Sequence, residues 1–185
     1  MLTDLKSALR PALVMTLAFA ALLGLAYPLA LTGLGQLLFP AQANGSLVRD
    51  GDRVVGSALI GQSFAAPEYF HGRPSAAGKG YDALASAGSN LGPNAQALAD
   101  RITPSAPGTP ADLVTASASG LDPHISPEAA LYQVARVSAA RGVAPDRLRA
   151  LVRAHAEAPT LGFLGEPRVN VLALNRDLDR LAARR

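Results

Sequence analysis

The residues most able to carry acid–base chemistry are Asp122 and His124, which flank Pro123. The nearby hydroxyl groups belong to Ser117, Ser119 and Ser126. A carboxylate that orients a histidine, which in turn activates a serine, is the arrangement of a hydrolase. Serine-rich turns before helices also occur for structural reasons, because hydroxyl oxygens cap helix ends. We favour the structural interpretation, and the alternative is a membrane-anchored extracytoplasmic enzyme or binding module that uses Ser119, Asp122 and His124.

A second candidate is a run of small residues that consists of Ser86, Ala87, Gly88, Ser89 and Asn90. Successive backbone N–H groups in such a loop can form a concave site for an anion. A tight turn needs the same residue types for conformational reasons alone. Spacing does not separate these two interpretations.

A third candidate lies in the segment 61–92, which is dense in Gly, Ser, Pro and aromatic residues. We expect this segment to form an ordered, loop-rich surface, because it has too many small residues for a long helix. The side chains expected to contact a partner are Tyr69, Phe70, His71, Arg73 and Tyr81. Arg73 could bind an anion or a carboxylate. The alternative, which we favour, is that the imidazole and the guanidinium hold loop carbonyls in place.

Other kinds of chemistry find no support in the sequence. The chain has no cysteine, which excludes disulfides and thiolate metal sites. The three histidines are far apart, and no Walker loop or nucleophile elbow is present. With 17 basic and 14 acidic residues and no basic stripe, the charge does not indicate nucleic-acid binding. We therefore expect no catalytic residue and no metal site.

The chain has an apolar segment near its N-terminus that would position the candidate residues relative to a membrane. No residue from Pro11 to Val48 is charged. About 20 apolar residues cross a bilayer, and a charge at its centre is costly. The sequence therefore predicts a cytoplasmic N-terminus at 1–10, a transmembrane helix at 11–39 and a soluble extracytoplasmic domain at 40–185.

Within this helix, Gly24 and Gly33 are small positions at which another helix could approach closely. Pro28 should kink the helix or loosen the turn before it.

The orientation follows from the basic residues at the two ends. Lys6 and Arg10 lie before the segment, close to its apolar part, whereas Arg49 and Arg53 after it are accompanied by aspartates. We therefore expect the N-terminus in the cytoplasm. The sequence Ala41-Gln42-Ala43 resembles a signal-peptide cleavage site, but the apolar segment is about twice as long as a typical h-region of 7–15 residues. We therefore favour a retained anchor.

The soluble part reads as one small mixed α+β domain. An Asp50-Gly51 pair predicts a hairpin in which both turn residues have positive φ. Ser126 is a good N-cap, and Gly142 is a good helix stop. The expected strands are 46–48, 53–60, 113–115 and 169–172, and a loop is expected at 41–45. The expected helices are 94–102, 127–141, 145–158 and one after 172. The apolar faces are expected to consist of Leu131, Val134, Ala135 and Ser138; of Leu148, Leu151, Val152 and His155; and of Val171, Leu174, Leu178 and Leu181.

Taken in order, several segments resemble one family. They are R-P-A-L at 10–13, Y-P-L at 27–29, N-G-S-L at 44–47, G-S-A-L-I-G-Q at 56–62, Y-F-H-G-R-P-S-A at 69–76, G-S-N-L-G-P at 88–93, V-T-A-S-A-S-G-L-D-P-H-I at 114–125, R-V-S-A-A-R at 136–141 and V-N-V-L-A-L-N at 169–175. This pattern resembles the KdpC family, the C subunit of the bacterial high-affinity potassium-transporting ATPase, over nearly the whole chain.

The resemblance implies a non-catalytic, single-span subunit of the bacterial inner membrane with a periplasmic body. Its partners would be a channel-like potassium-binding subunit, a P-type ATPase subunit and a small single-span subunit, so that ATP and potassium act at the level of the complex. The family is described as required for assembly and as a catalytic chaperone that raises the ATP affinity of the ATPase subunit. In that description the run matching Ser86–Asn90 is compared with an ABC-type signature loop.

An extracytoplasmic body cannot touch cytoplasmic ATP, so we expect any effect on ATP affinity to be indirect. A simpler hypothesis is that the surface 61–92 docks over the extracellular mouth of the channel-like subunit.

Overall fold

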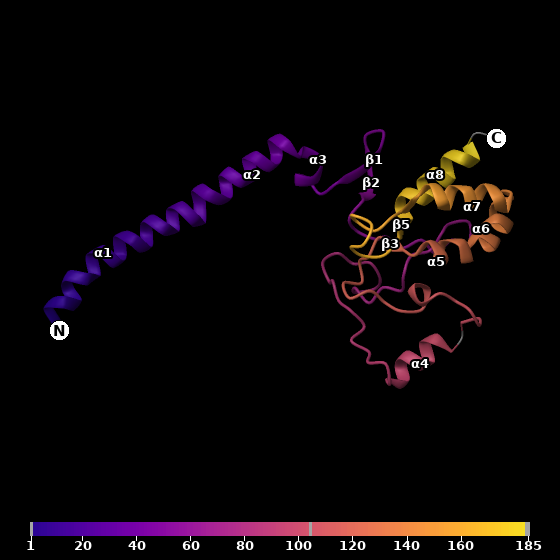
Figure 1. The fold of residues 1–185 in the computed structure, drawn as a ribbon, viewed down its shortest axis with the longest axis horizontal. Coiled ribbons are helices and arrows are strands. Elements are labelled where there is room, and N and C mark those ends of the chain that lie inside the picture. The colour runs from indigo at the N-terminus through magenta and orange to yellow at the C-terminus, as the bar shows by residue number, and fades with distance from the viewer. Residues whose placement is uncertain (1, 104, 184–185) are drawn as a thin grey trace. The chain divides into compact units, whose positions relative to one another are not determined.

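The structure is a computed structural model that describes residues 2–103 and 105–183. It divides into two units, Met1–Leu47 and Val48–Arg185, each of which is described by itself. The chain begins with one long helix and continues into a mixed body of short strands and helices, which confirms the predicted α+β class (Figure 1).

The N-terminal unit consists of α1 (Leu2–Ala21), the π-helical segment η1 (Leu22–Ala26), α2 (Tyr27–Leu38) and the short α3 (Pro40–Ala43). The stretch Lys6–Leu38 is long and apolar enough to cross a membrane, and it is not buried inside the protein. Residues 41–43 are helical, so the expected loop at 41–45 is wrong in its first part.

The π-helical segment lies directly before Pro28. The Tyr27 N–H donates to the Leu22 carbonyl, five residues back rather than four. Proline has no N–H, and its ring crowds the carbonyl one turn earlier. The predicted loosening of the helix upstream of Pro28 is therefore confirmed.

The body begins with a hairpin of β1 (Leu47–Asp50) and β2 (Arg53–Ser57). Gly51 has a φ of +57°, but neither Asp50 nor Asp52 has a positive φ, so the expectation of two such turn residues is wrong. After β2 the chain turns back on itself through a bridge between Ser57 and Ile60, where we expected the strand to continue.

A small antiparallel sheet forms the centre of the body. Its order is β3 (His124–Ile125), β5 (Arg168–Asn170) and β4 (Ala156–Glu157). His124 pairs with Asn170, and Glu157 pairs with Arg168. The sequence analysis missed β3 and β4, because two residues are too few for a periodic pattern.

The strand expected at 113–115 is absent. The chain instead forms the 3₁₀ turn η2 (Ala111–Leu113), and both the N–H and the hydroxyl of Thr115 donate to the Ala111 carbonyl. A β-branched residue here serves a local turn, so its β-propensity does not decide the structure.

The helices of the body are α4 (Gln96–Ile102), α5 (Pro127–Tyr132), α6 (Val134–Arg141), α7 (Pro145–Ala154) and α8 (Val171–Ala183). The Ser126 hydroxyl accepts from Ala129 N–H, and Gly142 has a φ of +64°, so both predicted helix signals are confirmed. The single helix expected between them is wrong, because the chain breaks at Gln133. Figure 1 shows α5 to α8 gathered together, with α4 apart from them.

The core lies among α5 to α8 and the three-stranded sheet. Its buried apolar side chains are Phe70, Ile125, Ala129, Ala130, Val134, Val137, Val143, Leu148, Val152, Val169, Val171, Leu174 and Leu178. The expected faces of α7 and α8 are confirmed, apart from His155, which is partly exposed and pairs with Asp177. Of the face expected before Gly142, Val134 is buried as predicted, but Leu131 and Ala135 are exposed. Ala130 and Val137 are buried instead. The break at Gln133 changes the register of that face.

Candidate functional site

The segment 61–92 has neither a helix nor a named strand, as predicted, and side chains from the helices hold it in place. Asn175 of α8 is buried and clamps the backbone of Phe70. Its Oδ1 accepts from Phe70 N–H at 2.8 Å, and its Nδ2 donates to Phe70 O at 2.9 Å. This pair satisfies two buried backbone groups that have no strand partner.

Gln133, at the break between α5 and α6, makes the same contact with the next residue of the segment. Its Oε1 accepts from His71 N–H at 2.8 Å, and its Nε2 donates to His71 O at 3.1 Å. Arg136 donates to the same Oε1 at 2.6 Å and to Pro67 O at 2.6 Å. Burial lowers the pKa of Arg136 from its usual value. Two amides and one guanidinium therefore fix the start of the segment to the helices.

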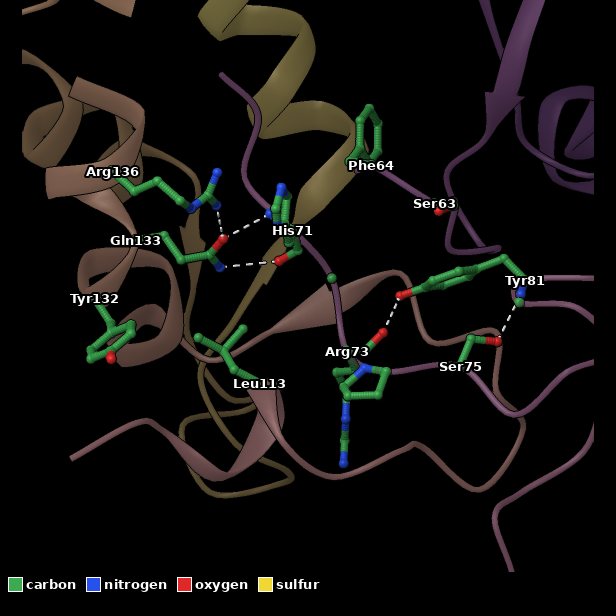
Figure 2. Close-up of a pocket in the computed structure, with 13 residues that line it drawn as sticks. Ser63, Phe64, His71, Arg73, Ser75, Tyr81, Leu113, Tyr132, Gln133 and Arg136 are labelled. Carbon is green, nitrogen blue, oxygen red and sulfur yellow. Dashed lines mark hydrogen bonds between the residues drawn. The ribbon is translucent and has the colours of Figure 1, made fainter. Parts of the chain in front are cut away.

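Next to this anchor lies a pocket of about 430 Å³, which Figure 2 shows with Arg136, Gln133 and His71 gathered at one end. It is lined by Ser63, Phe64, His71, Gly72, Arg73, Pro74, Ser75, Gly80, Tyr81, Leu113, Tyr132, Gln133 and Arg136. The lining combines aromatic walls with basic side chains and includes no carboxylate.

Arg73 and His71 mainly tie the chain to itself. Arg73 Nε donates to Thr115 O at 3.3 Å, and its Nη1 lies 3.5 Å from Asp122 Oδ2. His71 Nε2 lies 3.0 Å from the carbonyl of Ala66. These contacts support the interpretation that both side chains hold loop groups in place.

Tyr81 closes the other side of the pocket. Its hydroxyl donates to Arg73 O at 2.6 Å, and its N–H donates to the Ser75 hydroxyl at 2.7 Å (Figure 2). Burial, together with the nearby Asp122 carboxylate, raises the pKa of Tyr81. Tyr81 therefore reinforces the loop from within.

Two of the expected partner-contact residues lie deeper than we predicted. Phe70 is fully buried in the core, so the expectation that it contacts a partner is wrong. Its aromatic ring fills space among the helices, and the sequence alone did not indicate that. Tyr69 is partly buried, with its ring 5.5 Å from Phe64 and 4.6 Å from the Arg141 guanidinium.

The run Ser86–Asn90 packs against the segment 117–120. The Ser86 hydroxyl and the Ala87 N–H both donate to Ser119 O, at 2.9 and 3.0 Å. A Cβ on Gly88 would lie only 2.9 Å from Ala118 O. The small residues thus have a structural explanation, and the N–H of Ala87 is already committed.

The Asp122–His124 pair does not connect to a serine among the hydrogen bonds of the described residues. Asp122 Oδ1 accepts from His124 N–H at 3.0 Å and lies 3.5 Å from its Nδ1. The Ser119 hydroxyl accepts from Leu121 N–H, and the Ser126 hydroxyl caps α5. This geometry gives the hydrolase alternative no support. No group of three or more potential metal ligands occurs within residues 2–103 and 105–183.

Asp112 completes the cap of α5 from outside the helix by accepting from Ser126 N–H at 2.5 Å. Partial burial raises its pKa. The hydrogen bonds from Ser126 and from its own backbone, together with the nearby Arg73 charge, outweigh this effect and lower the pKa from its usual 3.8.

Comparison with known proteins supplies what the geometry cannot. Residues 9–180 match the family KdpC, described as K+-transporting ATPase, c chain. The chain belongs to the KdpC family. By its description, a KdpC chain is a subunit of a potassium-transporting ATPase. The match covers both the body and the apolar helix, which is long enough to span a membrane.

Three similar proteins are each named potassium-transporting ATPase KdpC subunit. One from Caulobacter vibrioides strain NA1000 is 61% identical over 183 residues, which cover 94% of this chain and 93% of that protein. One from Methylorubrum populi is 56% identical over 198 residues, and the alignment covers 95% of this chain and 98% of that protein. One from Variovorax paradoxus is 55% identical over 193 residues, and the alignment covers 98% of this chain and 100% of that protein.

Sequence reasoning missed Asn175 and Gln133, the two residues that organise the segment 61–92. Asn175 lies within the apolar stripe of α8, next to Leu174 and four residues after Val171. A polar residue on a buried face must find a partner. That interruption of the stripe was the signal available in the sequence.

Proposed function

We propose that this chain is a non-catalytic accessory subunit of an ATP-driven, high-affinity potassium uptake complex, and that it stabilises the assembly. The observation that carries the proposal is the family match across 9–180, which spans both the helix and the body. The hydroxyls of Ser119 and Ser126 accept from backbone N–H groups, and no hydrogen bond among the described residues links either of them to His124. This favours an accessory role over the anchored-enzyme alternative.

The proposed topology places the N-terminus in the cytoplasm, the helix in the inner membrane and the body in the periplasm. Lys6 and Arg10 before the apolar stretch support this orientation. The proposed partners are a channel-like potassium-binding subunit, a P-type ATPase subunit and a small single-span subunit. ATP hydrolysis would belong to the ATPase subunit.

The chain is also proposed to act as a catalytic chaperone that raises the affinity of the ATPase subunit for ATP. With a periplasmic body, this effect would be indirect. A periplasmic Ser86–Asn90 loop cannot reach cytoplasmic ATP, so coupling would pass through the membrane helices. Gly24 and Gly33 are the small positions in this helix at which such contacts are proposed. Small residues allow a partner helix to approach closely.

The proposed docking surface for the channel-like subunit is the segment 61–92. Leu84 supports it, since this large apolar side chain is 99% exposed in the body. Burial of this side chain in an apolar site on a partner would remove its apolar surface from water. Lys79 and Asp82 are also exposed and would form a polar rim around it.

The test is a detergent pull-down of the full-length chain from cells that express the whole transport operon. The other subunits should co-purify with the parent chain, and Leu84→Asp should reduce their yield and the affinity of potassium uptake. Ala150→Asp adds the same charge on an exposed position of α7 and serves as the matched control. If both variants co-purify as the parent does, the docking surface lies elsewhere. If the parent chain brings down no other subunit, the accessory role is wrong.

A further inference from the structure

An apolar loop protrudes between β4 and β5. Leu161, Phe163 and Leu164 expose 78%, 74% and 52% of their surfaces. Three large apolar side chains therefore gather on one short turn, at some distance along the chain from the segment 61–92. Exposed apolar groups gathered in this way mark a surface that meets another apolar phase.

The loop is closed by its own backbone. Thr160 N–H donates to Leu164 O at 3.0 Å, and Leu164 N–H donates to Thr160 O at 2.9 Å. Gly162 N–H donates to Pro159 O at 2.9 Å. Backbone groups that enter the edge of a bilayer must be satisfied internally, because hydrocarbon offers no partner. The N–H groups of Thr160, Gly162 and Leu164 therefore have partners within the loop.

The loop also holds its tip in a fixed conformation. Leu161 has a φ of +56°, which is rare for a leucine, and Gly162 and Gly165 have φ values of +81° and +85°. A leucine in the left-handed region is held there by its surroundings. The exposed fractions of Leu161, Phe163 and Leu164 show that this turn leaves its apolar side chains outside the core.

No residue from Ala158 to Gly165 is charged, and charged residues lie on either side of this stretch. Arg168 Nε lies 2.9 Å from Glu157 Oε2, and both side chains are about half exposed. Glu166 is also exposed at the base. An apolar tip above a charged base matches the change from acyl chains to headgroups at a membrane surface. One basic and two acidic residues would not attract anionic lipid, so apolar burial is the main attraction.

The apolar helix at the start of the chain would hold the body close to a bilayer. Only residues 39–46 separate the end of α2 from β1, so the body is tethered to the membrane that the helix Lys6–Leu38 can span. A short tether keeps the local concentration of the loop at the membrane high. We propose that the tip Leu161–Leu164 inserts into the interfacial region of the bilayer, as a second and shallow membrane contact of the chain. The proposal depends neither on the orientation of the chain nor on the docking surface 61–92.

The test uses the absence of tryptophan from the chain. Phe163→Trp provides a unique fluorescent reporter at the tip. The full-length variant is placed in phosphatidylcholine nanodiscs, with or without bromine on the acyl chains. Emission should shift to shorter wavelength, and brominated lipid should quench it. Leu84→Trp, at a fully exposed position of the same body, is the matched control and should show neither effect.

Emission from Phe163→Trp that brominated lipid does not quench would overturn the proposal, whether or not it is blue-shifted. Leu164→Trp repeats the measurement with a second exposed side chain, so the result does not rest on one variant. In the intact complex, a photoreactive phenylalanine analogue at 163 should form lipid adducts. An adduct with another polypeptide as the main product would assign the tip to a protein contact and reject insertion.

Discussion

The side chain of Asn175 pairs with both backbone groups of Phe70, as a neighbouring strand would in a sheet. It accepts from the backbone N–H of Phe70 and donates to its carbonyl, at 2.8 and 2.9 Å, although the two residues lie 105 positions apart. Gln133 repeats this contact at His71. Two consecutive residues of an irregular segment are thus paired by buried amides from two helices. This is how a segment rich in glycine and serine remains ordered.

The first prediction concerns this clamp. Asn175→Ala leaves the buried N–H and carbonyl of Phe70 without partners, each of which costs about 1–3 kcal/mol. We expect a loss of about 2–4 kcal/mol in the free energy of unfolding, measured by urea denaturation of the full chain in detergent. Asn94→Ala, at an exposed position before α4, should change it by less than about 0.5 kcal/mol. Equal effects of the two variants would contradict the role of Asn175.

The second prediction concerns pH. The pKa of Asp112 is lowered below 3.8 in the folded protein, so its ionised form stabilises the fold. This contribution is present above 3.8 and is lost as the pH falls through the lower folded value. Asp112→Asn should therefore lower the Tm at neutral pH, and its difference from the parent should shrink in strong acid. Thermal melts of both chains from neutral pH to strong acid measure this difference in Tm. A difference that stays constant with pH would refute the stabilising role of ionised Asp112.

The third prediction concerns close packing at Gly61. A Cβ at this position would lie 2.5 Å from Asp122 O and 2.6 Å from Tyr81 Cε1. Gly61→Ala should destabilise the body by about 1–3 kcal/mol through overpacking. At Gly92 nothing lies within 4 Å, so Gly92→Ala should be neutral or stabilising by up to about 1 kcal/mol. Chemical denaturation compares the pair, and a harmless Gly61→Ala would show that the segment is looser than described.

The fourth prediction concerns the membrane helix. Pro28→Ala restores an N–H and removes the ring that crowds the preceding turn. The segment Leu22–Ala26 should then become α-helical, and Tyr27 N–H should bond to Leu23 O in place of Leu22 O. Backbone chemical shifts of the labelled chain in nanodiscs report this change. A π-helical segment that persists in the variant would trace its cause to another residue.

The sequence by itself determined the parts that depend on local or bulk properties. The charge-free stretch predicted the long helix, because hydrocarbon excludes charge. Pro28, Ser126 and Gly142 predicted the loosened turn, the helix start and the helix stop, since each acts on the backbone next to it. The apolar stripe of α8 predicted its buried face. The family also followed from the sequence, because its motifs lie in order along the chain.

Only the tertiary structure decided how the segment 61–92 is held and which of its residues face outward. Phe70 and Leu84 are both large apolar residues in this segment, yet one is buried and the other is almost fully exposed. No periodic pattern separates them, because an irregular segment takes its partners from remote helices through Asn175 and Gln133. The strands of two residues and the break at Gln133 were likewise fixed by distant contacts. A capping residue or a proline decides where a particular helix begins or ends, whereas burial depends on what the rest of the chain places against each residue.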